Sequence, residues 1–146
     1  VYVMGASYGD HEVTNYLHAR FCSADKISPL CRIIIFNDDE FGHWLFFAAF
    51  IGLNVTVLLL QALFPYRGAM RGRDKALLTF NSLFIAAGIF SNLGFEEIGL
   101  DLYVVLALAV LSVCLWRRYG PQPLFVYYAA AYVIGLVVTF GVKIML

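Results

Sequence analysis

The side chains of this sequence best suited to chemistry are three histidines near its beginning, His11, His18 and His43. A metal site is one possibility, and the acids that would share it are Asp10, Glu12, Asp38, Asp39 and Glu40. Zinc proteases hold their ion with two histidines four residues apart on one helix face. His11 and His18 are seven apart, which on a helix separates them by two turns, about 10 Å. Because two ligands of one ion cannot be so far apart, a helix here predicts ordinary surface histidines and no metal, whereas a strand or loop could still bring the two histidines together.

A second possible site is the pair Glu96 and Glu97, which lies between two apolar stretches. Two adjacent carboxylates can act as a catalytic pair, but a solvated turn explains them more simply. The sequence contains no Cys-x-x-Cys pair, phosphate-binding loop, nucleophile elbow or basic patch for nucleic acid. We therefore predict no catalytic residues, no cofactor and no nucleic-acid partner.

The cysteines predict a disulfide bond. Cys22 and Cys31 are nine residues apart, and in an oxidising compartment they can close a small loop around Pro29. Cys114 lies in an apolar stretch and is expected to be a small apolar filler.

The elements that must position these residues are membrane helices. The chain is 62% hydrophobic and only 14% charged, whereas soluble domains are about a quarter charged. Four apolar stretches are long enough to cross about 30 Å of hydrocarbon. We expect one all-α bundle of four transmembrane helices in up-down order, at about 43–64, 77–95, 98–116 and 124–144.

Charge sorting predicts the orientation of these helices. If the chain crosses the membrane four times, nine of its ten acids share one side. Six bases and a single acid, Asp74, occupy the other side, and Lys and Arg are retained on the cytoplasmic face during insertion. Both termini are then non-cytoplasmic. The nine acids are Asp10, Glu12, Asp25, Asp38, Asp39, Glu40, Glu96, Glu97 and Asp101.

The chain begins at Val1, which fits either a cleaved signal peptide or a shortened chain.

Residues 1–42 are expected to form a small, partly β segment outside the cytoplasm, next to a transmembrane domain at 43–146. Residues 2–9 resemble a short strand that ends in a turn, and residues 31–36 are rich in β-branched side chains. A segment of this size buries too little apolar surface to be very stable alone. We expect it to rest on the membrane helices or on a partner.

Small residues four positions apart predict close helix contacts. Such residues let helix backbones approach each other in lipid, where the hydrophobic effect does not drive helices together. Three pairs have this spacing: Ala48 and Gly52, Ser82 and Ala86, Ala131 and Gly135.

These features favour a non-catalytic subunit or accessory factor of a larger membrane complex, with the lipid bilayer and other membrane subunits as partners. The alternative is a small membrane enzyme or transporter whose site lies on the acidic, non-cytoplasmic face. An enzyme should bring several of its candidate residues together around one cavity, whereas a subunit should leave them scattered. The residues concerned are His11, His18, His43, Glu96 and Glu97.

Overall fold

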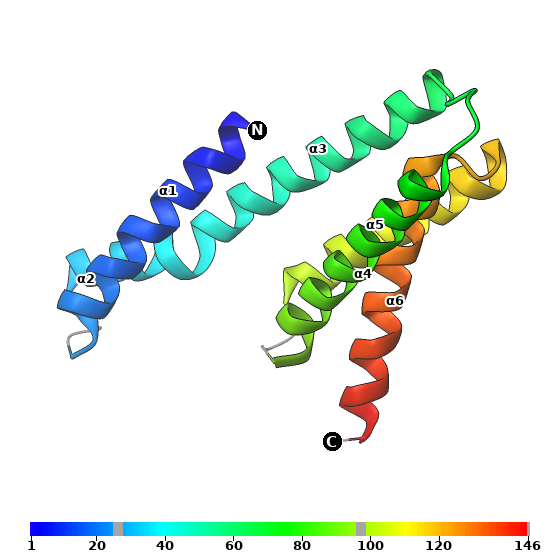
Figure 1. Cartoon of the computed structure of the whole chain (residues 1–146). Coiled ribbons are helices and arrows are strands. Elements are labelled where there is room, and N and C mark those ends of the chain that lie inside the picture. The colour runs from blue at the N-terminus through cyan, green and yellow to red at the C-terminus, as the bar shows by residue number, and fades with distance from the viewer. Residues whose placement is uncertain (25–27, 96–98, 146) are drawn as a thin grey trace. The chain divides into compact units, whose positions relative to one another are not determined.

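The computed structural model describes residues 1–24, 28–95 and 99–145, and within these ranges every regular element is helical (Figure 1). Two compact units are present, Val1–Leu53 and Asn54–Leu146, and the division between them falls inside one long helix. The elements are α1 (Tyr2–Leu17), the π-helical turn η1 (His18–Cys22), α2 (Pro29–Phe36), the π-helical turn η2 (Asn37–Phe41), α3 (Gly42–Leu63), α4 (Gly72–Phe95), α5 (Leu100–Tyr119) and α6 (Pro123–Met145).

Four of the described helices are long and apolar enough to cross a membrane. They span Pro29–Leu63, Gly72–Gly94, Leu100–Tyr119 and Pro123–Met145, and the first runs without a break through α2, η2 and α3. The prediction of a multi-pass helical membrane protein is therefore confirmed. Which side of the membrane holds the termini remains a prediction from the charges.

The prediction of a partly β N-terminal segment is wrong. Residues 2–9 belong to α1 and residues 31–36 to α2, and no strand occurs in the described residues. Helix α2 begins with a strong local signal, because the Ser28 side chain accepts a hydrogen bond from the backbone N–H of Cys31 and Pro29 occupies the first turn. These start signals and packing outweigh the low helix propensity of the β-branched residues, which costs only some tenths of a kcal/mol each.

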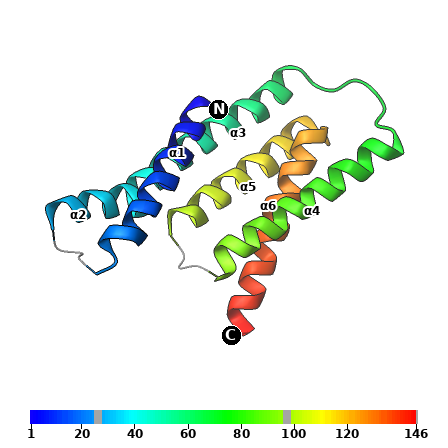
Figure 2. The same cartoon turned by 60° about the vertical axis from the view of Figure 1, so that its left-hand side comes forward.

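The first unit is an antiparallel helical hairpin. Its first arm is α1 with η1, and its second arm is α2, η2 and the beginning of α3, which lies alongside α1 in Figures 1 and 2. Near the open end, the Ser7 hydroxyl donates a hydrogen bond of 2.6 Å to the carbonyl of Gly42, and the rings of Tyr8 and Phe46 are 5.3 Å apart. At the closed end, the predicted Cys22–Cys31 disulfide is confirmed.

The second unit is built around α6, which packs against both α4 and α5. Its buried side chains include Leu93 of α4, Leu108 of α5 and Phe125 of α6. The loop before α4 is tied to the turn before α6, because the backbone N–H of Tyr66 donates a 2.8 Å hydrogen bond to the side chain of Gln122.

Small residues form the contact between α4 and α6. Ser82, Ala86, Ala131 and Gly135 are all buried, and the Ser82 hydroxyl lies 3.4 Å from the carbonyl of Tyr127. A Cβ atom added at Gly135 would lie 2.8 Å from Cβ of Ile89, so only glycine permits this approach. Two of the three predicted small-residue pairs thus pack within the chain, while Ala48 and Gly52 on α3 are exposed.

Candidate histidine–carboxylate site

The most unusual side chain of the first unit is Asp38, a carboxylate in η2 whose side chain is only 4% exposed. Two imidazoles approach its two oxygens. Nδ1 of His18 donates a 2.8 Å hydrogen bond to Oδ2, and Nδ1 of His11 lies 3.1 Å from Oδ1. One buried carboxylate therefore lies between two histidines that are seven residues apart in sequence.

The hairpin explains how both imidazoles reach one carboxylate. His11 and His18 project from the same face of the first arm, and Asp38 lies opposite them on the second arm. The side chains of His11 and His18 each cover part of the two-turn distance that separates them along the helix. Both therefore contact Asp38, and they do not need to contact each other. π-Helical turns are rare and frequent at functional sites, and this cluster involves two of them: η1 begins at His18 and η2 contains Asp38.

Two buried carboxylate oxygens in this unit lack a hydrogen-bond partner, Oδ1 of Asp38 and Oδ2 of Asp10. His11 is close to Asp38 Oδ1, but its Nδ1 also lies 3.2 Å from the backbone carbonyl of Asp38. Nδ1 carries at most one hydrogen, and the geometry directs it to the carbonyl. Among the described residues these are the only buried side-chain oxygen or nitrogen atoms without a partner. The hairpin therefore contains buried carboxylate oxygens that lack hydrogen-bond donors.

Asp39 and His43 complete the cluster. One carboxylate oxygen of Asp39, one of Asp38 and a ring nitrogen of His18 all lie within 4.8 Å of one another. His43 makes a 2.9 Å hydrogen bond to the backbone carbonyl of Asp39, and its ring centre is 5.0 Å from that of His11. A shallow cavity of about 340 Å³ opens beside the cluster, lined by Arg32, Ile35, Phe36, Asp39 and Glu40.

The structure therefore brings together the three predicted histidines, while Glu96 and Glu97 lie outside the described residues. Sequence reasoning missed that Asp38 is the residue on which the cluster is centred. A signal for this arrangement does exist in the sequence. Polar or small side chains recur at helical spacing along one face of the first arm, at Ser7, His11, Thr14, His18 and Cys22. This stripe is the face that the second arm covers.

The hydroxyl groups of this stripe are not placed as nucleophiles. Ser7 donates its hydrogen bond to the carbonyl of Gly42, and Thr14 donates to the carbonyl of Asp10 at 2.7 Å. A nucleophilic hydroxyl is instead held by a general base. The cluster has the chemistry of a site that binds a cation.

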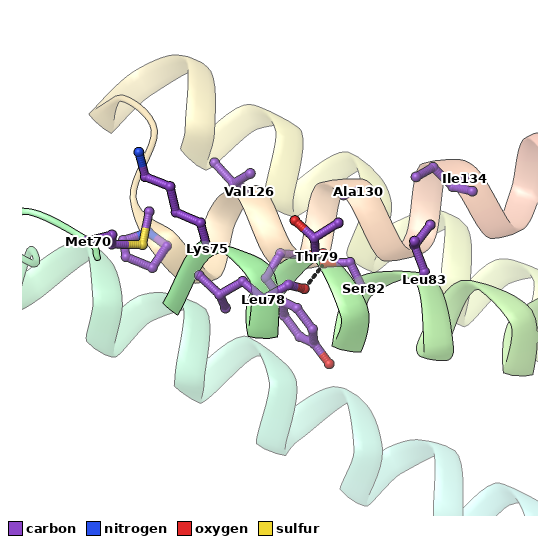
Figure 3. Close-up of a pocket in the computed structure, with 11 residues that line it drawn as sticks. Met70, Lys75, Leu78, Thr79, Ser82, Leu83, Val126, Ala130 and Ile134 are labelled. Carbon is purple, nitrogen blue, oxygen red and sulfur yellow. Dashed lines mark hydrogen bonds between the residues drawn. The ribbon is translucent and has the colours of Figure 1, made fainter. Parts of the chain in front are cut away.

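The second unit contains a separate cavity of about 290 Å³ between α4 and α6 (Figure 3). Its walls are mainly apolar, with Leu78, Leu83 and Ile134 among them, and Lys75 is its single charged residue. Two of the lining residues contact each other, because the Ser82 hydroxyl lies 3.4 Å from the backbone carbonyl of Tyr127. Among the described residues, the lining of this cavity includes no histidine or carboxylate, and its titratable side chains are Lys75 and Tyr127.

Comparison of the chain with protein-family models, with curated proteins and with solved structures gives no match.

Proposed function

We propose that this protein is a non-catalytic integral membrane subunit or accessory factor of a larger membrane complex. The observation that carries the proposal is how the second unit uses its buried hydroxyl groups. Ser82, Ser112 and Thr139 each donate to a backbone carbonyl three or four residues earlier in the same helix. Hydroxyl groups used in this way are satisfied within their own helix, which suits a scaffold better than a polar pathway through the membrane.

Among the described residues of the second unit, the one buried acid also has a local role. Asp101 accepts hydrogen bonds from the side chain of Asn92 at 2.7 Å and from the backbone N–H groups of Gly99 and Leu102. These bonds fix the beginning of α5 against the end of α4. A carboxylate satisfied by three short-range donors is well suited to a structural task.

The test of this proposal uses the exposed face of α3. A Cβ atom added at Gly52 meets nothing within 4 Å outside its own stretch of helix, so Gly52→Leu places its added bulk on an exposed part of α3. We expect this variant to insert normally but to be lost from a native complex, because leucine keeps the neighbouring helix at a distance. The measurement is the fraction of chain that runs with a stoichiometric partner on a native gel after mild detergent extraction.

Gly88→Leu is the matched control for this experiment, because Gly88 is also exposed with nothing within 4 Å of an added Cβ atom, but the residues four positions away, Phe84 and Asn92, are not small. Gly88→Leu should leave the complex intact. The subunit proposal fails if the wild-type chain purifies as a stable, well-folded monomer and Gly52→Leu behaves like the wild type.

We also propose that both termini and the histidine–carboxylate site face the non-cytoplasmic side. Single cysteines at exposed positions test this orientation: Glu12→Cys in α1 and Ala69→Cys in the loop before α4, each combined with Cys114→Ala. The disulfide-bonded Cys22 and Cys31 do not react with maleimides. An impermeant maleimide added to intact cells should label Glu12→Cys and spare Ala69→Cys, and the reverse pattern would invert the topology.

A second candidate function is a membrane enzyme or transporter that acts through the same cluster. The observation that favours it is the meeting of His11 and His18 at Asp38, because a subunit was expected to leave these residues scattered. This alternative requires the chain to act without a partner. A stoichiometric partner on every extracted copy would count against it.

A further inference from the structure

We propose that the hairpin of the first unit binds one divalent transition-metal ion, for which Zn²⁺ is the probe, through His18, Asp38 and Asp39. The three ligand atoms already lie within 4.8 Å of one another. This site differs from the one that the sequence spacing argued against. It takes a single imidazole together with two carboxylates, and His11 acts through Asp38.

The distances suit one ion after small side-chain movements. Zinc binds imidazole nitrogen and carboxylate oxygen at about 2.0–2.2 Å, so two ligands of a tetrahedral site lie roughly 3.3 Å apart. The 2.8 Å hydrogen bond between His18 and Asp38 must therefore lengthen by about 0.5 Å when the ion enters. The neutral ring of His18 then carries its hydrogen on Nε2 and offers the lone pair of Nδ1. Asp39 is exposed and can swing inward by rotation of its side chain.

The electrostatics of the hairpin favour a cation at this position. Oδ1 of Asp38 is buried and makes no hydrogen bond, and Oδ2 of Asp10 is in the same condition. Among the described residues only histidines form ion pairs with Asp38, and no lysine or arginine does so. A buried carboxylate without a permanent counter-charge is destabilised by its loss of hydration, and a bound cation removes that cost.

His11 is a positioning residue in this proposal. Its Nδ1 lies 3.1 Å from Oδ1 and 3.2 Å from the backbone carbonyl of the same residue, Asp38. It bonds the backbone carbonyl of Asp38 and lies against Oδ1, and so restrains the residue whose carboxylate faces the ion. Partners of this kind orient metal ligands, and their removal costs roughly 10–100-fold in metal affinity.

The surroundings provide access for the ion. Asp39 contributes both to the ligand cluster and to the wall of the 340 Å³ cavity, where Glu40 and Arg32 also lie. Three protein ligands leave one tetrahedral position for water or for a further ligand. A ligand set that mixes imidazole with carboxylates suits Zn²⁺ or Mn²⁺. It suits Ca²⁺ less well, because Ca²⁺ prefers oxygen ligands alone.

The test measures zinc binding to the full chain, purified in detergent with its disulfide intact and stripped with a chelator. Equilibrium dialysis followed by elemental analysis should give about one zinc per chain, and X-ray absorption should report a single imidazole in a shell of nitrogen and oxygen. His18→Gln and Asp39→Asn should each weaken binding at least 10-fold. His11→Gln should weaken it about 10–100-fold without changing the absorption signature of the residual site.

Glu12→Gln provides the matched control, because it removes the same charge from an exposed acid of α1 outside the cluster. It should keep the affinity of the wild type. Asp39→Asn is the key variant because Asp39 is exposed, and circular dichroism and the retained disulfide verify its fold. The proposal is overturned if folded wild-type protein binds no stoichiometric zinc, or if His18→Gln and Asp39→Asn bind it as tightly as the wild type.

Discussion

Replacement of Gly135 with leucine is expected to separate α4 from α6 and to destabilise the second unit. Even the first carbon of the new side chain would lie 2.8 Å from Cβ of Ile89 and 3.2 Å from the carbonyl oxygen of Ala86. Overpacking of a close contact costs about 1–3 kcal/mol when the surroundings can adjust. A helix backbone adjusts poorly, so we expect the upper end of that range, measured as a lowered midpoint of thermal or denaturant unfolding in detergent.

Gly141→Leu is the matched control for this prediction. Gly141 also lies in α6, but a Cβ atom there meets nothing within 4 Å, so leucine should be tolerated. Equal stability of the Gly135→Leu and Gly141→Leu variants would show that α4 and α6 do not pack as described. Gly135 is for the same reason unsuitable as a probe of contacts with other subunits, because its substitution disturbs the chain itself.

Removal of the Cys22–Cys31 disulfide is expected to loosen the hairpin by about 2–3 kcal/mol, the value that the loop-entropy model gives for a loop of this size. The bond closes the hairpin at the end where His18 approaches Asp38. We expect the backbone amides of α1 in the Cys22→Ser/Cys31→Ser variant to exchange with deuterium roughly 100-fold faster, if exchange there requires the hairpin to open. Mass spectrometry of the intact chain and its peptides measures this rate.

Cys114→Ser is the control for the loss of a sulfur atom, because Cys114 is a free cysteine. It should leave exchange in α1 unchanged. Unchanged protection of α1 in the double serine variant would mean that the hairpin contacts alone hold the first arm in place.

The membrane helices could be predicted from the sequence because long apolar stretches between charged turns have few other structures. The disulfide could be predicted because its two cysteines are close in sequence. The strands were predicted from Tyr2, Val3 and the three isoleucines 33–35, whose β propensity is a weak preference that packing overrides. The informative residues were Ser28 and Pro29, which begin a helix just before those isoleucines.

The site was missed for a different reason. The distance argument about His11 and His18 considered only the rise along one helix, and it left out a third residue between the two side chains. Asp38 comes from the other arm, twenty residues after His18, and the chain must fold back before they meet. The small-residue pairs had the same ambiguity, because spacing predicts a close contact but not whether the partner helix belongs to the same chain.

The helix from Pro29 to Leu63 runs without a break, so it fixes the distance between Asp38 and the expected membrane crossing, which a flexible linker would not fix. Its 35 residues extend about 52 Å, while the hydrocarbon core of a bilayer is about 30 Å thick. The helix is therefore roughly 20 Å longer than the hydrocarbon core is thick. Asp38 lies on the part of the helix that precedes the expected crossing at residue 43. The α-helical values of about 1.5 Å and 100° per residue apply from Gly42 onward, whereas Asp38 itself lies in the π-helical turn η2, so the direction in which its carboxylate faces depends on that turn. Loss of the π-helical turn, so that Asn37–Phe41 became ordinary α-helix, would therefore redirect Asp38 relative to the membrane crossing without changing the number of residues between them.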